Sequence, residues 1–329
     1  MNLSTFQTIE LSILTITACY HAIASYLETS QFQAPGEITM AGTQKLHWYE
    51  QGNGSTTIIL DSSLGGVEGY LLIDKLAELG RVVVFDRPGY GWSPGSWRSR
   101  TSKQINSELQ SLLQAAQIKP PYVLIGDSFG SYNMRLFAYS YPEQVAGLVM
   151  TDGLHEEQML ALPLRLVVLK LFFSISFVFV AIGAMLGVVR IVGLMGLFEF
   201  IKPELTRCDP MRLLQVKRSF YRASHWLTMA REMIGLDASG RQLRAANELG
   251  DLPVVNIKAG TFLKLPGSPR LWSWLIGEAD RVRDDIHIAL AKVTNSSKLF
   301  PALDSSHFVW VDRPEVIVAA VRQILNRSD

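Results

Sequence analysis

The sequence contains little cysteine and almost no net charge, and both shortages exclude classes of protein. Cys19 and Cys208 are the two cysteines in 329 residues, too few for a disulfide framework or a cysteine-rich zinc site. The 31 lysines and arginines are balanced by 30 aspartates and glutamates, which leaves a net charge of +1. Because no basic block would attract a polyanion, we expect no nucleic-acid partner. No metal or nucleotide motif is present either, so no cofactor is expected.

Charged residues are missing from two long stretches of the chain. Leu11 to Leu27 contains no Lys, Arg, Asp or Glu, and neither do the 19 residues from Leu171 to Val189. The first stretch is compatible with a membrane anchor, a cleaved signal peptide or a core helix. A signal peptide begins with basic residues, whereas the first basic residue here is Lys45, so a membrane anchor is favoured.

Short apolar runs rich in β-branched residues alternate with helical stretches along most of the chain. Such runs are typical of strands that are buried on both faces of a parallel sheet. Two shorter strands are expected earlier, between Glu37 and Gln51. The pattern therefore predicts a doubly wound, mostly parallel α/β sheet. Its expected strands are Thr57 to Leu60, Arg81 to Phe85, Tyr122 to Ile125, Val145 to Thr151, Pro253 to Lys258 and Lys298 to Leu303.

The alternation is interrupted between His155 and about Gly250, where nearly a hundred residues show no strand pattern. This interval predicts an inserted helical cap that is unusually apolar. The predicted division of the chain is an N-terminal apolar segment at 1–33, a first part of the core at 34–154, the cap at 155–250 and a second part of the core at 251–329. Two further helices are expected, from Trp272 to Val293 and from Pro314 onward.

The five residues from Gly126 to Gly130 read Gly-Asp-Ser-Phe-Gly and lie between an expected strand and an expected helix. This is the context of a nucleophile elbow, a sharp turn that projects a serine hydroxyl from the carboxyl edge of the sheet. The two glycines allow the tight turn and leave room for neighbouring backbone. An ordinary glycine-rich turn is the alternative explanation. The sequence predicts that Ser128 is a nucleophile.

A serine hydroxyl needs a base to take its proton, and histidine has a suitable pKa. His307 lies in a polar loop after the last expected strand, where it can reach the same edge of the sheet. We therefore predict His307 as the base. His155 is a candidate for substrate contact. The four other histidines are expected to pack in the interior or lie on the surface: His21, His47, His225 and His287.

A reaction at a carbonyl also needs hydrogen-bond donors for the oxyanion. The expected donors are the N–H of Phe129, directly after the nucleophile, and the N–H of Leu64 in the loop after an early strand. The small residues of that loop allow close approach to the main chain, although a flexible glycine turn would have the same composition. Ser63 and Asp127 lie beside these donors and are predicted, with His155, to contact substrate.

Four segments of the chain, in this order, resemble signatures of the α/β-hydrolase superfamily, in its esterase and lipase-like branch. They are Phe85 to Ser93, Pro120 to Gly130, Tyr141 to Val149, and His307-Phe308 with Asp312 to Glu315. The resemblance covers roughly Glu37 to Glu156 and Pro253 to Ile324. It implies acyl hydrolysis by a serine, a histidine and an acid. The chain departs from the common pattern at Asp127, where relatives often have histidine, and in its apolar insertion.

The acid that orients His307 has two candidates. Most relatives place it after the seventh strand, but the loop from Ala259 to Lys264 contains no carboxylate. Asp152 follows the sixth strand at the same sheet edge as Ser128, and some branches of the superfamily place the acid there. We favour Asp152. Asp280 is the alternative, although it lies among other charged residues of an expected helix, where a solvated face is the ordinary explanation.

These residues together predict a hydrolase that cleaves an apolar or lipid-like carboxylic ester through an acyl-enzyme on Ser128. One alternative is an aminopeptidase, an amidase or an acyltransferase that uses the same three residues. A second is a non-catalytic receptor or membrane scaffold with a hydrolase-like fold. The expected partner is a small apolar ester, and no oligomeric state is predicted.

The apolar run in the cap is long enough to cross a bilayer, at about 1.5 Å of rise per residue. However, Ser128 precedes this run and His307 follows it. A single crossing would place the two residues on opposite sides of the membrane, so a lone span is excluded if they share a site. The cap is instead predicted to meet a membrane, either as a re-entrant hairpin that turns near Gly187 and Arg190 or as helices that lie on the bilayer. A soluble lid with buried apolar helices is the alternative.

Overall fold

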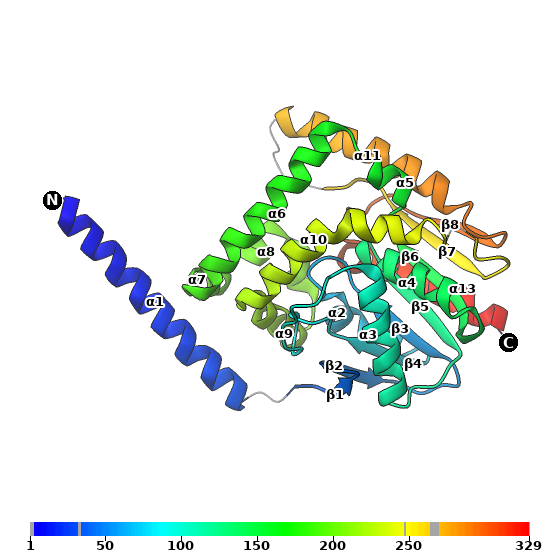
Figure 1. The fold of residues 1–329 in the computed structure, drawn as a ribbon, viewed down its shortest axis with the longest axis horizontal. Helices are drawn as coiled ribbons and strands as arrows, with labels where there is room; N and C mark the ends of the chain where they lie inside the picture. Colours follow the sequence, from blue (N-terminus) through cyan, green and yellow to red (C-terminus); the bar gives the residue numbers. More distant parts are fainter. Residues whose placement is uncertain (1–2, 32–33, 247, 264–269, 329) are drawn as a thin grey trace.

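The computed structural model describes residues 3–31, 34–246, 248–263 and 270–328, and Figure 1 shows the chain as a ribbon. The ends of the expected N-terminal segment, at 1–2 and 32–33, lie outside the described residues, and so does Lys264. Eight strands form one sheet in the order β1-β2-β4-β3-β5-β6-β7-β8. β1 and β2 pair antiparallel with their neighbours, and the strands from β4 to β8 pair parallel. The predicted mostly parallel α/β sheet is confirmed.

The strands begin and end within two residues of the expected positions. β5 runs from Tyr122 to Asp127, two residues beyond the expected end, so it leads directly into Ser128. The other strands are β1 (Glu37–Ala41), β2 (Gln44–Gln51), β3 (Thr57–Asp61), β4 (Arg81–Phe85), β6 (Val145–Thr151), β7 (Val254–Ala259) and β8 (Ser297–Ala302).

Each central strand buries alternate side chains in two separate apolar layers, because successive side chains of a strand point to opposite faces. In β3, Ile58 and Leu60 join one layer and Ile59 joins the other. Helices α2, α12 and α13 supply the first layer, and α3, α4 and α11 supply the second. These helices are α2 (Glu68–Leu76), α3 (Ser102–Ala115), α4 (Phe129–Ser140), α11 (Arg270–Leu290), α12 (Val309–Asp312) and α13 (Pro314–Ser328).

Between β6 and β7 the chain forms the helices of the expected cap. The longest two, α6 (Leu164–Met185) and α10 (Ala223–Leu243), pack along one another. α10 also covers the loop after β3, because Gly65 faces the side chains of His225 and Met229. The other elements are α5 (Glu156–Leu160), α7 (Val188–Leu194), α8 (Leu197–Ile201), α9 (Pro210–Phe220) and the 3₁₀ helix Pro203–Arg207, while a further 3₁₀ helix, Pro142–Gln144, precedes β6.

Helix α1 (Leu3–Gln31) stands away from the rest of the molecule and meets it near α7 (Figure 1). Within the described part of the chain, two helical segments are long and apolar enough to cross a membrane: Gln7–Glu28 of α1 and Leu164–Met185, which is α6. The uncharged run that starts at Leu171 does not continue as one helix to Val189, because α6 ends at Met185 and Gly187 turns the chain with a φ of 78°.

We predict that replacing Gly130 destabilises the elbow. A Cβ at this position would lie 2.2 Å from the carbonyl oxygen of Asp61 in β3, and backbone cannot give way as a flexible side chain can. Gly130→Ala should lower the free energy of unfolding by about 2–3 kcal/mol. Chemical denaturation measures this effect. Gly95→Ala is the matched control, because nothing lies within 4 Å of its added methyl. Equal stability of the two variants would contradict the prediction.

Candidate active site

Ser128 occupies a sharp turn between β5 and α4. Its backbone has a φ of 47° and a ψ of −112°, a conformation that is costly for a residue with a side chain. The turn is held from outside, because the N–H of Ser128 donates to the carbonyl of Thr151 at 2.9 Å. Gly126 and Gly130 approach neighbouring backbone too closely for a Cβ. The local sequence therefore explains why the serine is presented at the carboxyl end of its strand.

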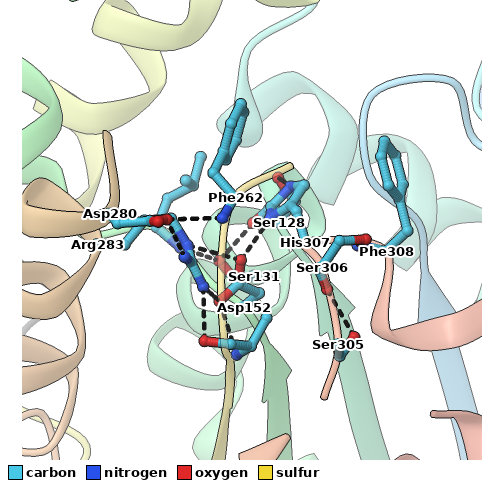
Figure 2. Close-up of polar contacts among 12 residues, drawn as sticks. Ser128, Ser131, Asp152, Phe262, Asp280, Arg283, Ser305, Ser306, His307 and Phe308 are labelled. Carbon is cyan, nitrogen blue, oxygen red and sulfur yellow. Dashed lines mark hydrogen bonds and ion pairs between the residues drawn. The ribbon is translucent and has the colours of Figure 1, made fainter. Parts of the chain in front are cut away.

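Three side chains from distant parts of the chain meet at this turn (Figure 2). The Nε2 atom of His307, in the loop after β8, lies 2.9 Å from Oγ of Ser128. Its Nδ1 atom lies 2.5 Å from Oδ2 of Asp152, which directly follows β6. The carboxylate can only accept a hydrogen bond, so Nδ1 carries the proton and Nε2 is free to accept one from the serine hydroxyl. The arrangement can pass a proton from Ser128 to His307.

Asp152 is buried and held by several donors besides His307. Arg283 donates to both of its oxygens, at 3.0 and 2.6 Å. His287 lies 3.1 Å from Oδ1, and the N–H of Ala259 donates to the same oxygen at 3.1 Å. Burial by itself would raise the pKa of Asp152, but hydrogen bonds from His287 and His307 and the charge of Arg283 outweigh burial and hold this pKa well below its usual value. The carboxylate therefore stays ionised beside His307.

Asp280, the alternative acid, is directed elsewhere. Its Oδ1 atom accepts a hydrogen bond from the N–H of Phe262 at 2.6 Å, and its Oδ2 atom accepts one from Thr261 at 2.9 Å. Arg283 bridges the two carboxylates, because it also donates to Asp280 at 2.8 Å. Asp280 therefore anchors the loop after β7, and the ring of His307 contacts Asp152 instead.

The sequence predicts no function for Arg283, and His287, which was expected to pack in the interior or lie on the surface, is buried. Both side chains lie on α11 and contact Asp152. Asp280, Arg283 and His287 follow one another at spacings of three and four residues, which places them on one face of a helix. This spacing indicates that the three side chains act on one side of the helix. Nothing in the sequence indicates that this helix face meets the end of β6.

The two expected oxyanion donors lie on elements that the protein holds firmly. Phe129 is the first residue of α4, and Leu64 lies in the loop after β3. Within the described part of the chain, neither N–H donates to a protein acceptor. Arg87 fixes the loop by donating to the carbonyls of Ser62 and Ser63, both at 2.7 Å. Their assignment as oxyanion donors remains a prediction.

Two of the three side chains predicted to contact substrate form hydrogen bonds within the protein. The hydroxyl of Ser63 donates to Glu68. His155 caps α5 by accepting from the N–H of Glu157 at 3.4 Å. Both carboxyl oxygens of Asp127 are buried without a hydrogen-bond partner. Burial, together with the charges of Glu68 and Asp152, raises the pKa of Asp127 well above its usual value. Substrate contact by these three residues remains a prediction.

The described residues contain no group of three or more His, Cys, Asp or Glu side chains that could hold a metal ion. Figure 2 shows the polar contacts of the site, which join protein side chains and backbone groups.

Comparison with known proteins identifies related sequences over part of the chain. Residues 60–174 match a family model described as the alpha/beta hydrolase fold. An uncharacterized Bacillus subtilis protein, YqjL, is 34% identical over 107 residues, which are 32% of this chain and 42% of that protein. A 2-hydroxy-6-oxononadienedioate/2-hydroxy-6-oxononatrienedioate hydrolase of Paraburkholderia phymatum is 32% identical over 124 residues, 35% of this chain and 43% of the hydrolase. The chain therefore spans about two fifths of the length of these relatives.

Solved structures match nearly the whole chain. The epoxide hydrolase CorEH has a TM-score of 0.63 and 15% identity, and the match covers 89% of this chain and 99% of CorEH. An enol-lactonase from Burkholderia xenovorans has a TM-score of 0.59 and 16% identity, with 88% and 100% covered. A thermophilic esterase from Thermogutta terrifontis has a TM-score of 0.59 and 18% identity, with 90% and 99% covered. These likenesses establish the fold.

We predict that Asp152→Asn slows the reaction of Ser128 with a fluorophosphonate by about 10⁴-fold. The amide is neutral and cannot stabilise the imidazolium that forms when His307 takes the serine proton. The second-order labelling rate measures the loss. Asp304→Asn is the control, because Asp304 is an exposed carboxylate in the loop of His307. Equal labelling rates for the two variants would exclude Asp152 as the acid.

Arg283→Gln should weaken the fold in a pH-dependent way. The folded-state pKa of Asp152 is depressed, so its ionisation stabilises the fold above the unfolded value of about 4 and ceases to do so as pH falls through the folded pKa. Removing Arg283 should therefore cost about 3 kcal/mol near pH 7, because a buried ion pair is broken. The cost should shrink below about pH 4, where Asp152 begins to lose its charge in the variant.

Urea denaturation across this pH range measures the difference. Arg281→Gln is the control on the same helix, since Arg281 is exposed, and it should change stability by less than about 0.5 kcal/mol. A loss for Arg283→Gln that is the same at every pH would show that Asp152 is not its electrostatic partner.

Proposed function

We propose that this chain, which has the α/β-hydrolase fold, is a serine hydrolase of that superfamily and cleaves a carboxylic ester through an acyl-enzyme on Ser128. The observation that carries the proposal is the continuous set of contacts from Ser128 through His307 to Asp152, at 2.9 and 2.5 Å. A nucleophile, a base and a group that orients the base are what acyl transfer by a serine requires.

In the proposed acylation step, Oγ of Ser128 attacks the ester carbonyl carbon while Nε2 of His307 takes the hydroxyl proton. The ionised Asp152 stabilises the imidazolium that results. The carbonyl oxygen becomes an oxyanion and accepts hydrogen bonds from the N–H groups of Phe129 and Leu64. When the intermediate collapses, the bond to the alcohol breaks and His307 gives its proton to the alcohol oxygen. Ser128 is left as an ester of the acyl group.

Deacylation repeats these steps with water. His307 takes a proton from a water molecule, which attacks the acyl carbon, and the oxyanion forms again at the same two donors. Collapse of this intermediate releases the carboxylic acid and returns the proton to Ser128. The loop after β3 must therefore keep its shape through both steps, which is the contribution of Arg87 to the chemistry.

The substrate is proposed to be apolar or lipid-like. The ring of Phe262 lies 5.3 Å from the ring of His307, and the ring of Phe308 lies 5.9 Å from it. Figure 2 shows these two aromatic side chains on either side of His307. Leu64 and Met229 add apolar side chains near the loop after β3. Such surroundings favour an apolar acyl or alcohol group over a charged one.

The serine also separates this proposal from other reactions in the superfamily. Epoxide hydrolases and dehalogenases of this fold need a carboxylate at the elbow, because their intermediate is an alkyl ester of that carboxylate. Ser128 forms an acyl-enzyme instead. An amide, or transfer of the acyl group to an acceptor other than water, would use the same residues, so the leaving group and the acceptor are decided by substrate tests.

We expect Ser128→Ala to abolish fluorophosphonate labelling and to remove nearly all ester turnover. The oxyanion donors remain, so residual catalysis of about 10³-fold over water is allowed. The measurement is hydrolysis of p-nitrophenyl esters with acyl chains of two to sixteen carbons. Wild-type activity should be higher with medium or long chains than with acetate.

Ser55→Ala is the control, because Ser55 is an exposed serine remote from the elbow. A folded Ser128→Ala protein that keeps wild-type turnover would refute the mechanism. A wild-type protein that never labels would favour a non-catalytic, ligand-binding role instead.

A further inference from the structure

Helix α6 has two different faces along its whole length. One face is exposed to solvent and, apart from Arg165 in the first turn, carries apolar side chains at helical spacing. The opposite face is buried against the cap and contains Leu166, Ser174, Ala181 and Ala184. The most exposed side chains of the outer face are Leu164, Val168, Leu171, Phe172, Ile175, Phe179, Ile182 and Met185, which are 48–76% exposed. An apolar face of this length, 22 residues, is unusual on a protein that meets only water.

The buried face shows how α6 can meet a bilayer. α6 packs along α10, and Lys170 of α6 forms an ion pair with Asp237 of α10 at 2.6 Å. Asp237 is 41% exposed. If α6 crossed a membrane, α10 and this half-exposed carboxylate would enter the hydrocarbon with it, which is costly. A helix that packs on the protein along one side and exposes apolar side chains along the other fits the surface of a bilayer.

Helix α1 is joined to the end of α6 by a polar stripe. Thr17, His21, Ser25 and Glu28 lie on one side of α1, three or four residues apart. The hydroxyl of Thr17 donates to the carbonyl of Leu186 at 2.8 Å. Gly187 lies so close that a Cβ there would be 2.4 Å from the carbonyl oxygen of Thr17. The middle of α1 is therefore in direct contact with the turn between α6 and α7.

Arg190 closes this junction. Its guanidinium donates to both oxygens of Glu28, at 2.5 and 2.9 Å, and also to Ser25 at 3.0 Å and His21 at 3.1 Å. The Arg190 side chain is only 4% exposed and lies over the ring of Tyr221 at 4.6 Å. Every nitrogen of the guanidinium has a partner on α1, so α1 is fixed to the cap by charge-assisted hydrogen bonds.

We propose that α1 and the outer face of α6 lie flat on one leaflet of a lipid bilayer, as two helices joined at the Arg190 junction, and that neither crosses it. If Gln7–Glu28 spanned the membrane, Thr17 would lie near its centre, and the turn at Gly187 would be drawn to the same depth. Helices α8 and α9, which contact α7 beside this turn, carry the ion pair of Glu199 with Lys217, and charged groups of this kind are costly to bury in hydrocarbon. This inference goes beyond the proposed hydrolysis and does not depend on it.

The test is the depth of probes along each helix. Val168, Ile175 and Ile182 on α6 are replaced by Cys one at a time, in a full chain that carries Cys19→Ser and Cys208→Ser, and each is labelled with an environment-sensitive fluorophore. Ile9, Ile16 and Ile23 on α1 are treated likewise. The proteins are bound to phosphatidylcholine vesicles, and quenching by lipids brominated at different acyl positions gives the depth of each probe. Trp97→Cys is the control, because this side chain is 98% exposed and lies in a loop of the core.

We expect the three probes of each helix to share one shallow depth, about 5–10 Å below the headgroups, and the control probe to escape quenching. A crossing helix would instead separate its first and last probes by about 21 Å, from 14 residues at about 1.5 Å each. Such a graded profile would overturn the proposal. So would probes on α6 that are not quenched at all, which would identify the cap as a soluble lid.

Arg190→Gln tests the junction separately. It should leave the α6 probes at their common depth while the three α1 probes no longer share one. Arg207→Gln is the control, since Arg207 is an exposed cap residue. An unchanged α1 profile in Arg190→Gln would show that the junction does not position α1. Fluorophosphonate labelling of the same proteins in detergent reports on Ser128 alone, so failure of the membrane proposal and failure of the hydrolase proposal are distinguishable.

Discussion

The buried guanidinium of Arg87 is the interaction on which the site depends most. Arg87 lies in the loop after β4. Its guanidinium donates to the carbonyls of Ser62 and Ser63 in the loop after β3, and it forms two hydrogen bonds of 2.9 Å with Glu232 of α10. Asp61 supplies a second carboxylate. A planar group with five donors can satisfy all these acceptors at once, and a lysine could not. One side chain thus sets the loop that carries an expected oxyanion donor and fastens the cap above it.

The carboxyl ends of the parallel strands explain how the rest of the site assembles. β5 leads into Ser128, Asp152 directly follows β6 and the loop after β8 carries His307, so three chain segments meet at one edge. The carboxylate that contacts His307 is Asp152, after β6, whereas Asp280 anchors the loop after β7. Arg283 of α11 donates to both carboxylates. It therefore links the acid that faces His307 to the loop beside it.

The inner and outer surfaces of the cap differ in polarity. Its inner surface buries polar groups of its own, such as Glu232 of α10, while its outer surface on α6 is largely apolar. Apolar residues on both faces of α6 give the helix no strong polarity pattern, so its sequence resembles that of a membrane span. Packing on α10 removes one face from any contact with lipid. The composition of α6 is therefore that of a membrane-spanning helix, whereas its packing along α10 leaves only one side free to contact lipid.

The sequence by itself determined the features that rest on local rules. Strand periodicity predicted the parallel sheet, and the glycines around Ser128 predicted the elbow, because both depend on neighbouring residues. The loop position of His307 and the carboxylate at Asp152 were also visible. Tertiary structure alone decided the contact of His307 with Asp152, the candidate that the sequence favoured, and the contacts of Arg283 and His287 with that carboxylate. It also decided which face of α6 is covered. These outcomes depend on how helices far apart in the chain pack together, and the spacing of residues within one helix does not indicate which other element that helix contacts.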